Sequence, residues 1–317
     1  MALQIAVLST SRIVAEVMRE IGNWPEVEVT AIVCRPQSAE KAHAWAAEYG
    51  VPAVYTDEAA AYAAGGFDAV YIGTANHLHY AAAKRALQAG YHVLLEKPFT
   101  ATAAEARELF ALADAKGLVL MEAITIPYLP QYAFLQAELP KIGEVRGAMA
   151  SFCARSARYD DYLKGIWNTT FDPACLGGAL NDMNVYNLHL LCGLLGVPGR
   201  AEYRPSCGPN GIDTAGLALL DYGGFTAAAL AAKDSEGRNG MVLRRLSRST
   251  PEATWRTAPT PCPWCTVYWA ACAAAALVWT APSRNATVWP MNLRSLHGSL
   301  RKKTRMPRRQ PGCAPCG

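Results

Sequence analysis

The residues best placed for chemistry are Glu96, Lys97 and Pro98, because they directly follow a short apolar run of strand length. Over residues 68–95 an apolar run, a stretch with helical spacing and a second apolar run predict a strand, a helix and a parallel strand. Ligands of open parallel sheets sit outside the carboxyl ends of the strands. We therefore expect residues 74–79 and 96–98 to meet at that edge, where a lysine can bind or activate a ligand.

Strands and helices alternate from Gln4 to Glu122, which predicts an α/β fold with a doubly wound parallel sheet, the Rossmann arrangement. From Ala123 the rhythm changes. A long apolar helix over residues 180–195 and a hairpin of strands 214–220 and 226–232 predict an α+β domain with a mostly antiparallel sheet. We place the domains at residues 1–122 and 123–237. We expect the second to be incomplete, with an unpaired edge on its hairpin.

The composition changes at about Gly237. Residues 238–317 carry thirteen Lys and Arg and a single acid, for a net charge of +12, whereas the rest of the chain sums to −8. We hypothesise that this stretch is a basic, disordered tail produced by a shifted reading frame. Its alternatives are zinc binding by two C-x-x-C motifs, Cys262–Cys265 and Cys313–Cys316, and nucleic-acid binding by its basic residues. We expect neither, since the motifs lie too far apart and a periodic core is missing.

The chain starts with no basic leader, and its apolar runs are too short for a membrane span. We therefore expect a cytoplasmic protein with no membrane contact. Its ten cysteines should then be mostly thiols, because the cytosol is reducing.

The loop after the first strand lies where dinucleotide-binding proteins carry G-x-G-x-x-G before a helix. Serines replace the first two glycines and Val14 replaces the third. Serine is small, and its hydroxyl can bond a phosphate at a helix N-terminus. The alternative is a plain cap between a strand and a helix. The candidate cofactor-binding residues here are Ser9, Thr10, Ser11, Arg12 and Ile13.

Two further loops are candidates for nucleotide contacts. Arg35 follows the second strand with no acid before Glu40, which favours the 2′-phosphate of NADP over the ribose hydroxyl of NAD. The alternative is a solvated arginine. Thr74, Asn76 and His79 follow the strand at residues 68–72 and would line the nicotinamide side. The alternative is a helix-capping Asn76 with two surface histidines, His77 and His79. No cysteine or carboxylate partner recurs beside these residues, so we expect no metal site.

Four motifs follow one another in order along residues 3–235. They are the run from Asp68 through Glu96-Lys97-Pro98, then Met121-Glu122-Ala123, Ile142-Gly143-Glu144-Val145 and the segment from Leu176 to Gly196. With these motifs, which are specific as a set, the chain resembles the Gfo/Idh/MocA oxidoreductases. The departures are the lost glycines of the first loop, Ala75 after Thr74, and Asn184.

The resemblance implies that Lys97, Asp182 and Tyr186 are catalytic, and that Glu96 and Lys97 also contact the cofactor. Asp182 and Tyr186 are four residues apart on the predicted helix and so share one face. A tyrosine has an unperturbed pKa of about 10, so a nearby cation such as Lys97 would help it act near neutral pH. Asp182 would orient the substrate or hold Lys97. His189 lies on the neighbouring face, either lining the pocket or satisfied within the helix.

The implied activity is that of an NAD(P)-dependent dehydrogenase or reductase acting on CH–OH groups. Hydride would pass between the nicotinamide and a sugar, cyclitol or related hydroxy or carbonyl compound, with NADP preferred to NAD. The family also implies a homo-oligomer, which the unusual C-terminal stretch puts in question. Two alternatives stay open: a nucleotide-sensing protein of the same fold without turnover, and the inactive product of a damaged gene.

Overall fold

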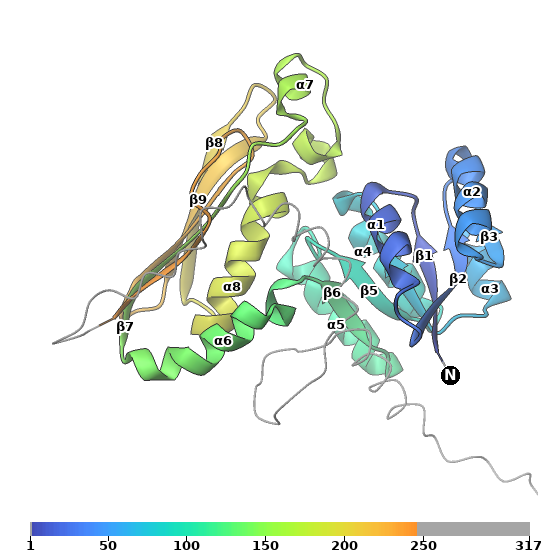
Figure 1. The fold of residues 1–317 in the computed structure, drawn as a ribbon, viewed down its shortest axis with the longest axis horizontal. Coiled ribbons are helices and arrows are strands. Elements are labelled where there is room, and N and C mark those ends of the chain that lie inside the picture. The colour runs from blue at the N-terminus through green and yellow to red at the C-terminus, as the bar shows by residue number, and fades with distance from the viewer. Residues whose placement is uncertain (1, 246–317) are drawn as a thin grey trace, which may run out of the picture.

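The computed structural model describes residues 2–245, which form two domains lying side by side (Figure 1). The first is a six-stranded parallel sheet in the order β3-β2-β1-β4-β5-β6, and it confirms the predicted Rossmann fold. Its strands are β1 (Leu3–Leu8), β2 (Val27–Val33), β3 (Ala53–Tyr55), β4 (Ala69–Ile72), β5 (His92–Glu96) and β6 (Leu120–Ala123). Its helices are α1 (Arg12–Ile21), η1 (Pro36–Ser38), α2 (Ala39–Tyr49), α3 (Glu58–Ala64), η2 (Asn76–Leu78), α4 (His79–Gln88) and α5 (Ala103–Lys116).

Two apolar cores enclose this sheet. Helices α1 and α2 pack on one face through residues such as Val14 and Ala42, and α3, α4 and α5 cover the other through residues such as Leu87 and Leu109. Strands β4 and β5 are buried along their whole length, as expected for parallel strands covered on both sides. The strand order reverses between β1 and β4. The loops after β2, β1, β4 and β5 therefore follow one another along the carboxyl edge, where doubly wound folds bind ligands.

The second domain is a five-stranded mixed sheet in the order β11-β7-β10-β9-β8, in which only the β7–β10 pair is parallel. Helix α8 lies along one face of the sheet (Figure 1). The strands are β7 (Val145–Cys153), β8 (Arg200–Cys207), β9 (Asp213–Asp221), β10 (Thr226–Ala232) and β11 (Gly240–Arg245). The helices are η3 (Ile126–Tyr128), α6 (Pro130–Glu138), η4 (Leu139–Ile142), α7 (Tyr159–Leu163), η5 (Thr169–Phe171), η6 (Pro173–Cys175), the π-helical η7 (Leu180–Asn184) and α8 (Val185–Leu195).

The structure corrects two expectations about this domain. The hairpin of β9 and β10 has both edges paired, because β7 lies beside β10 and β8 beside β9. The strand β11 pairs with β7, so the ordered domain continues past the expected end at Gly237 to Arg245. Sequence periodicity missed β11 because it follows the polar stretch 233–239, where the composition of the chain changes. The rest of the expected tail, residues 246–317, lies outside the described residues, as do both C-x-x-C motifs.

Within residues 2–245 no helix is both long and apolar enough to cross a membrane. The same part of the chain holds no cluster of three or more His, Cys, Asp and Glu residues able to bind a metal ion.

Candidate active site

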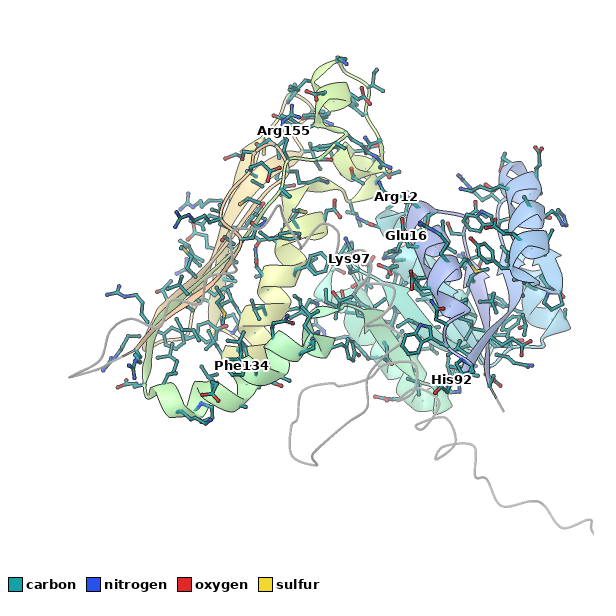
Figure 2. The ribbon with its side chains drawn as sticks, in the orientation of Figure 1. Arg12, Glu16, His92, Lys97, Phe134 and Arg155 are labelled. Carbon is teal, nitrogen blue, oxygen red and sulfur yellow. The ribbon has the colours of Figure 1, made fainter. Side chains whose placement is uncertain are left out.

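Lys97 lies where the two domains meet (Figure 2). It directly follows β5, and the other two candidate catalytic residues come from the second domain. Its Nζ lies 2.9 Å from Oδ1 of Asp182 and 5.0 Å from the centre of the Tyr186 ring. Asp182 belongs to the π-helical turn η7 and Tyr186 to the first turn of α8. The structure thus brings the three candidate catalytic residues into one cluster.

A second lysine completes this cluster. Lys233 follows β10, and its Nζ donates to Oδ2 of Asp182 at 2.8 Å. Each carboxylate oxygen of Asp182 therefore contacts a different ammonium group. Burial alone would raise the pKa of the Asp182 carboxyl, but Lys97 and Lys233 together outweigh burial and hold that pKa well below its usual range. Asp182 is consequently a carboxylate at any physiological pH.

The sequence analysis missed Lys233. The signal was present, since Lys233 ends the apolar run of β10 much as Lys97 follows that of β5. The segment 226–233 carries no recognisable motif around its lysine, however. The pairing with Asp182 depends on how β10 sits beside the turn η7. Asn184, one of the departures from the family pattern, fixes that contact by donating from Nδ2 to the carbonyl oxygen of Ala229 at 3.0 Å.

Glu96 is buried beneath the cluster rather than exposed at its surface. Its Oε1 accepts from the Tyr71 hydroxyl at 2.7 Å, and its Oε2 accepts from the backbone N–H of Lys97 at 3.2 Å. Burial raises the pKa of Glu96, although the bond from Tyr71 and the charge of Lys97 oppose that rise. These contacts fix the backbone at Lys97, and the direct contact of Glu96 with the cofactor stays a prediction.

His79 is fully buried at the start of α4. Its Nδ1 lies 2.8 Å from the carbonyl oxygen of Pro98 and its Nε2 lies 3.2 Å from that of Thr74. Burial lowers the pKa of His79, and the two carbonyl contacts partly offset this effect. His79 thus ties the loop after β4 to the loop after β5, and its contact with a cofactor stays a prediction.

Two polar contacts join the domains beside this loop. Asn76 donates from Nδ2 to the carbonyl oxygen of Leu176 at 2.8 Å. His189, which the sequence placed on a neighbouring helix face, lies with its Nε2 2.9 Å from Oε2 of Glu122 at the end of β6. Both contacts hold the second domain over the carboxyl edge of the parallel sheet.

The first loop is anchored through its serines. The Ser11 hydroxyl caps α1 and donates to the carbonyl oxygen of Gly73 at 2.6 Å. Ser9 has a φ of 109°, in the region that favours glycine, and its Oγ accepts from the N–H of Ser11 at 3.0 Å. A Cβ on Gly73 would lie 2.6 Å from Val14. The loop therefore packs tightly against the end of β4 despite its lost glycines.

The candidate cofactor residues form a row along the sheet edge. Arg35 follows β2, the first loop follows β1, Thr74 follows β4 and Lys97 follows β5. Arg12 begins α1 with its side chain 63% exposed (Figure 2). Arg35 is also exposed.

This row fits a dinucleotide. The buried Oγ1 of Thr74 has no hydrogen-bond partner among the described residues, which leaves a polar atom for a ligand to satisfy. The N-terminus of α1 places the positive end of the helix dipole at this edge, which favours a phosphate. Lys97 lies beyond Thr74 along the same edge.

Comparison with known proteins agrees with this geometry. Residues 3–124 match the family model described as an oxidoreductase family with an NAD-binding Rossmann fold. The chain is 34% identical over 249 residues to the scyllo-inositol 2-dehydrogenase (NADP⁺) IolU of Bacillus subtilis strain 168, covering 76% of this chain and 75% of that one. It is 30% identical over 254 residues to the uncharacterized oxidoreductase YgjR of Escherichia coli K12, covering 77% of each.

A solved structure of KijD10, a 3-ketoreductase from Actinomadura kijaniata in complex with NADP and TDP-benzene, superposes with a TM-score of 0.68 at 28% identity, covering 77% of this chain and 74% of that one. The family match, the extent of these likenesses and the shared two-domain fold lead to one conclusion: the chain belongs to the Gfo/Idh/MocA family of NAD(P)-dependent oxidoreductases.

Proposed function

We propose that this protein transfers hydride between a nicotinamide cofactor and a sugar-like or cyclitol-like hydroxy or carbonyl compound, with Lys97, Asp182 and Tyr186 as its active site. The observation that carries the proposal is the convergence of these three side chains at the domain boundary. The substrate class is supported by the relatives, since the Bacillus protein is named for a cyclitol and the Actinomadura protein is a 3-ketoreductase.

In the reduction direction a nicotinamide cofactor, when bound, would supply a hydride to the carbonyl carbon. Tyr186, 6% exposed, donates its hydroxyl proton to the carbonyl oxygen and is left as a phenolate that later takes a proton from solvent. The Lys97 ammonium stabilises that negative charge from 5.0 Å above the ring. Asp182 holds Lys97 in place. Alcohol oxidation follows the same steps in reverse, with the phenolate as the base.

The test is turnover of ketosugars and keto-cyclitols with NADPH, followed by nicotinamide absorbance. Tyr186→Phe removes only the hydroxyl and should lower the rate by about 10²–10⁴-fold while NADPH still binds. Tyr80→Phe is the matched control, because the Tyr80 hydroxyl bonds Glu108 on the surface, away from the cluster. A Tyr186→Phe enzyme with parental turnover would contradict the assignment. Nucleotide binding by the parent chain without turnover of any of these compounds would favour a nucleotide-sensing protein.

We also propose a preference for NADP over NAD. Arg35 is exposed at the end of β2, and no acid precedes Glu40. A second cation lies nearby, because Lys41 donates from Nζ to the carbonyl oxygen of Thr10 in the first loop at 2.8 Å. Two cations beside the ribose position favour a 2′-phosphate.

Self-association is a further part of the proposal. The face of the second sheet opposite α8 carries Met149 and Leu230, which are 50% and 38% exposed. In register with them lie Val242, Leu219 and Leu217 on the adjacent strands. An exposed apolar sheet face of this kind fits a second copy of the chain. Leu230→Lys should shift the sedimentation of the protein toward the monomer, whereas Val197→Lys, at an exposed site outside the face, should not.

We place the protein in the cytosol. The five cysteines within residues 2–245 are all free thiols, two of them buried, which fits a reducing compartment. Cell fractionation tests this placement. Recovery of the protein in an oxidising compartment, with disulfides formed, would contradict it.

A further inference from the structure

Lys233 is buried beside the proposed active site, and the proposed reaction assigns it no role. Its side chain is 2% exposed, and its Nζ donates to the carbonyl oxygen of Thr170 at 2.7 Å and to Oδ2 of Asp182 at 2.8 Å. The same Nζ lies 4.4 Å from the centre of the Phe171 ring. Burying an ammonium group is costly unless it is paired and hydrogen-bonded, and an apolar side chain would serve packing at lower cost. The contacts of Lys233 therefore need an explanation beyond packing.

The sharing of Asp182 supplies that explanation. Lys97 binds Oδ1 and Lys233 binds Oδ2, so the carboxylate plane cannot rotate to give both oxygens to Lys97. Lys97 is thereby kept with its Nζ over the Tyr186 ring. Lys233 itself is anchored by the backbone of η5 and the end of β10, neither of which belongs to the cofactor domain. The direction of the Lys97 ammonium is thus fixed from the second domain.

The cluster also carries excess positive charge, because two ammonium groups share one carboxylate. The surrounding titratable groups are otherwise engaged. Glu96 bonds Tyr71, Glu122 contacts His189, His79 bonds two carbonyl oxygens, and Asp213 accepts from the N–H of Leu180 and from the Tyr203 hydroxyl. Asp213 is a further carboxylate whose charge acts on Lys233, so the excess of +1 belongs to Lys97, Lys233 and Asp182 alone. The Lys97 ammonium over the Tyr186 ring favours the phenolate, the form needed to take a proton from an alcohol.

We propose that Lys233 is a positioning residue of this active site, which locks Asp182 so that Lys97 faces Tyr186 and which supplies the charge that makes Tyr186 an effective base. This inference rests on the proposed function, because it concerns the reaction assigned to the Lys97, Asp182 and Tyr186 cluster. Lys233 touches neither substrate nor cofactor in this scheme and acts through Asp182.

The test compares the parent, Lys233→Met and Lys233→Gln, with Lys84→Met as a surface control. Lys84 pairs with Glu108 at the exposed surface between α4 and α5. Both Lys233 variants remove the charge, and the glutamine retains a hydrogen-bond donor. We expect alcohol oxidation by both to fall about tenfold or more at neutral pH. The midpoint of its pH profile should rise by about one unit, so that activity partly recovers at high pH. The affinity for NADP should stay unchanged.

A purely structural role for Lys233 would give a different result. The variants would then lose thermal stability and activity at every pH, with the midpoint of the pH profile unmoved. That result overturns the proposal, as does failure of both variants to fold or parental activity at neutral pH.

A second readout separates this proposal from the proposed function. NMR titration of lysines labelled at the ε carbon reports on Lys97 without any substrate. We expect the Lys97 resonance to shift in Lys233→Met and to stay in place in Lys84→Met. A shifted resonance in a protein that turns over no substrate would reject the proposed function and keep the coupling of the two lysines through Asp182. An unmoved Lys97 resonance in an enzyme that turns over substrate would keep the proposed function and reject the coupling of the two lysines through Asp182.

Discussion

The two sheets differ in how they are covered, but the exposure of the two lysines that share Asp182 does not follow that difference. Helices cover both faces of the parallel sheet, whereas α8 covers only one face of the mixed sheet. Accordingly, β5 is buried throughout and β9 alternates between buried and half-exposed residues. Lys97 follows the covered strand and is 18% exposed at the sheet edge, where ligands bind. Lys233 follows a strand of the half-covered sheet and is 2% exposed. Position at the edge, rather than strand burial, therefore decides which lysine can meet a substrate.

The largest expected effect comes from replacing Lys97, the more exposed of the two lysines. Lys97→Met should lower turnover by about 10²–10⁴-fold, because Tyr186 loses its adjacent cation. NADPH affinity should change little, and the fold should survive because Asp182 keeps Lys233 as its partner. Steady-state kinetics and NADPH titration measure the two effects. Lys84→Met is the control, and near-parental turnover in Lys97→Met would refute the catalytic role.

Core substitutions sharpen the difference between the sheets. Leu95→Ala, at a fully buried site of β5, should cost about 2–5 kcal/mol in the free energy of unfolding at any protein concentration. Leu230→Ala, on the open face of the second sheet, should cost less than about 1 kcal/mol at low concentration. Its cost should grow with concentration if copies of the chain associate through that face.

Urea unfolding at two protein concentrations measures these costs. Equal costs for the two substitutions in dilute protein would show that the open face is covered within the single chain. A cost of Leu230→Ala that is independent of concentration would argue against association through this face.

At the cofactor edge the expected effect is smaller. Arg35→Ala should weaken NADP binding by about tenfold and leave NAD binding nearly unchanged, since only NADP offers a 2′-phosphate to the guanidinium. Fluorescence titration of both reduced cofactors against the parent and the variant measures the preference. Equal losses of affinity for NADP and NAD would show that Arg35 does not recognise the 2′-phosphate. A parent protein that binds NAD more tightly than NADP would contradict the proposed preference.

The smallest effect concerns His79, which joins the loops after β4 and β5. Burial lowers its pKa in the folded state below the unfolded value of about 6.5, so the unfolded chain binds the proton more tightly. The stability that depends on neutral His79 is therefore complete above about pH 6.5 and declines as the pH falls below it, by at most about 1.4 kcal/mol per pH unit.

Urea unfolding between pH 7 and 5 measures this decline. His79→Gln, which cannot titrate, should remove the part of the decline due to His79. His43→Gln, at an exposed site on α2, is the control. An identical pH dependence in His79→Gln and the parent would show that burial does not perturb His79.

Much of the site was readable from the sequence because its residues are carried by local patterns. The strand–helix–strand period placed Lys97 at the sheet edge. The family resemblance singled out Asp182 and Tyr186, and their four-residue spacing placed them on one helix face. The same periodicity gave the Rossmann domain, since each of its units is formed by neighbours in the sequence. Residue types in a sequence do not show how exposed each side chain is, however. Glu96 and His79 were therefore expected at the cofactor surface, although both are buried.

What the sequence by itself determined is thus the parallel sheet, its ligand-binding edge and the three residues that the proposed chemistry needs. Only the tertiary structure decided that β7 pairs in parallel with β10, that β11 extends the sheet to Arg245, and that Lys233 shares Asp182 with Lys97. The physical reason is the range of the contacts. Helical and strand periods arise from bonds between near neighbours, whereas the pairing of distant strands and the meeting of Lys97, Asp182 and Lys233 depend on how whole elements pack.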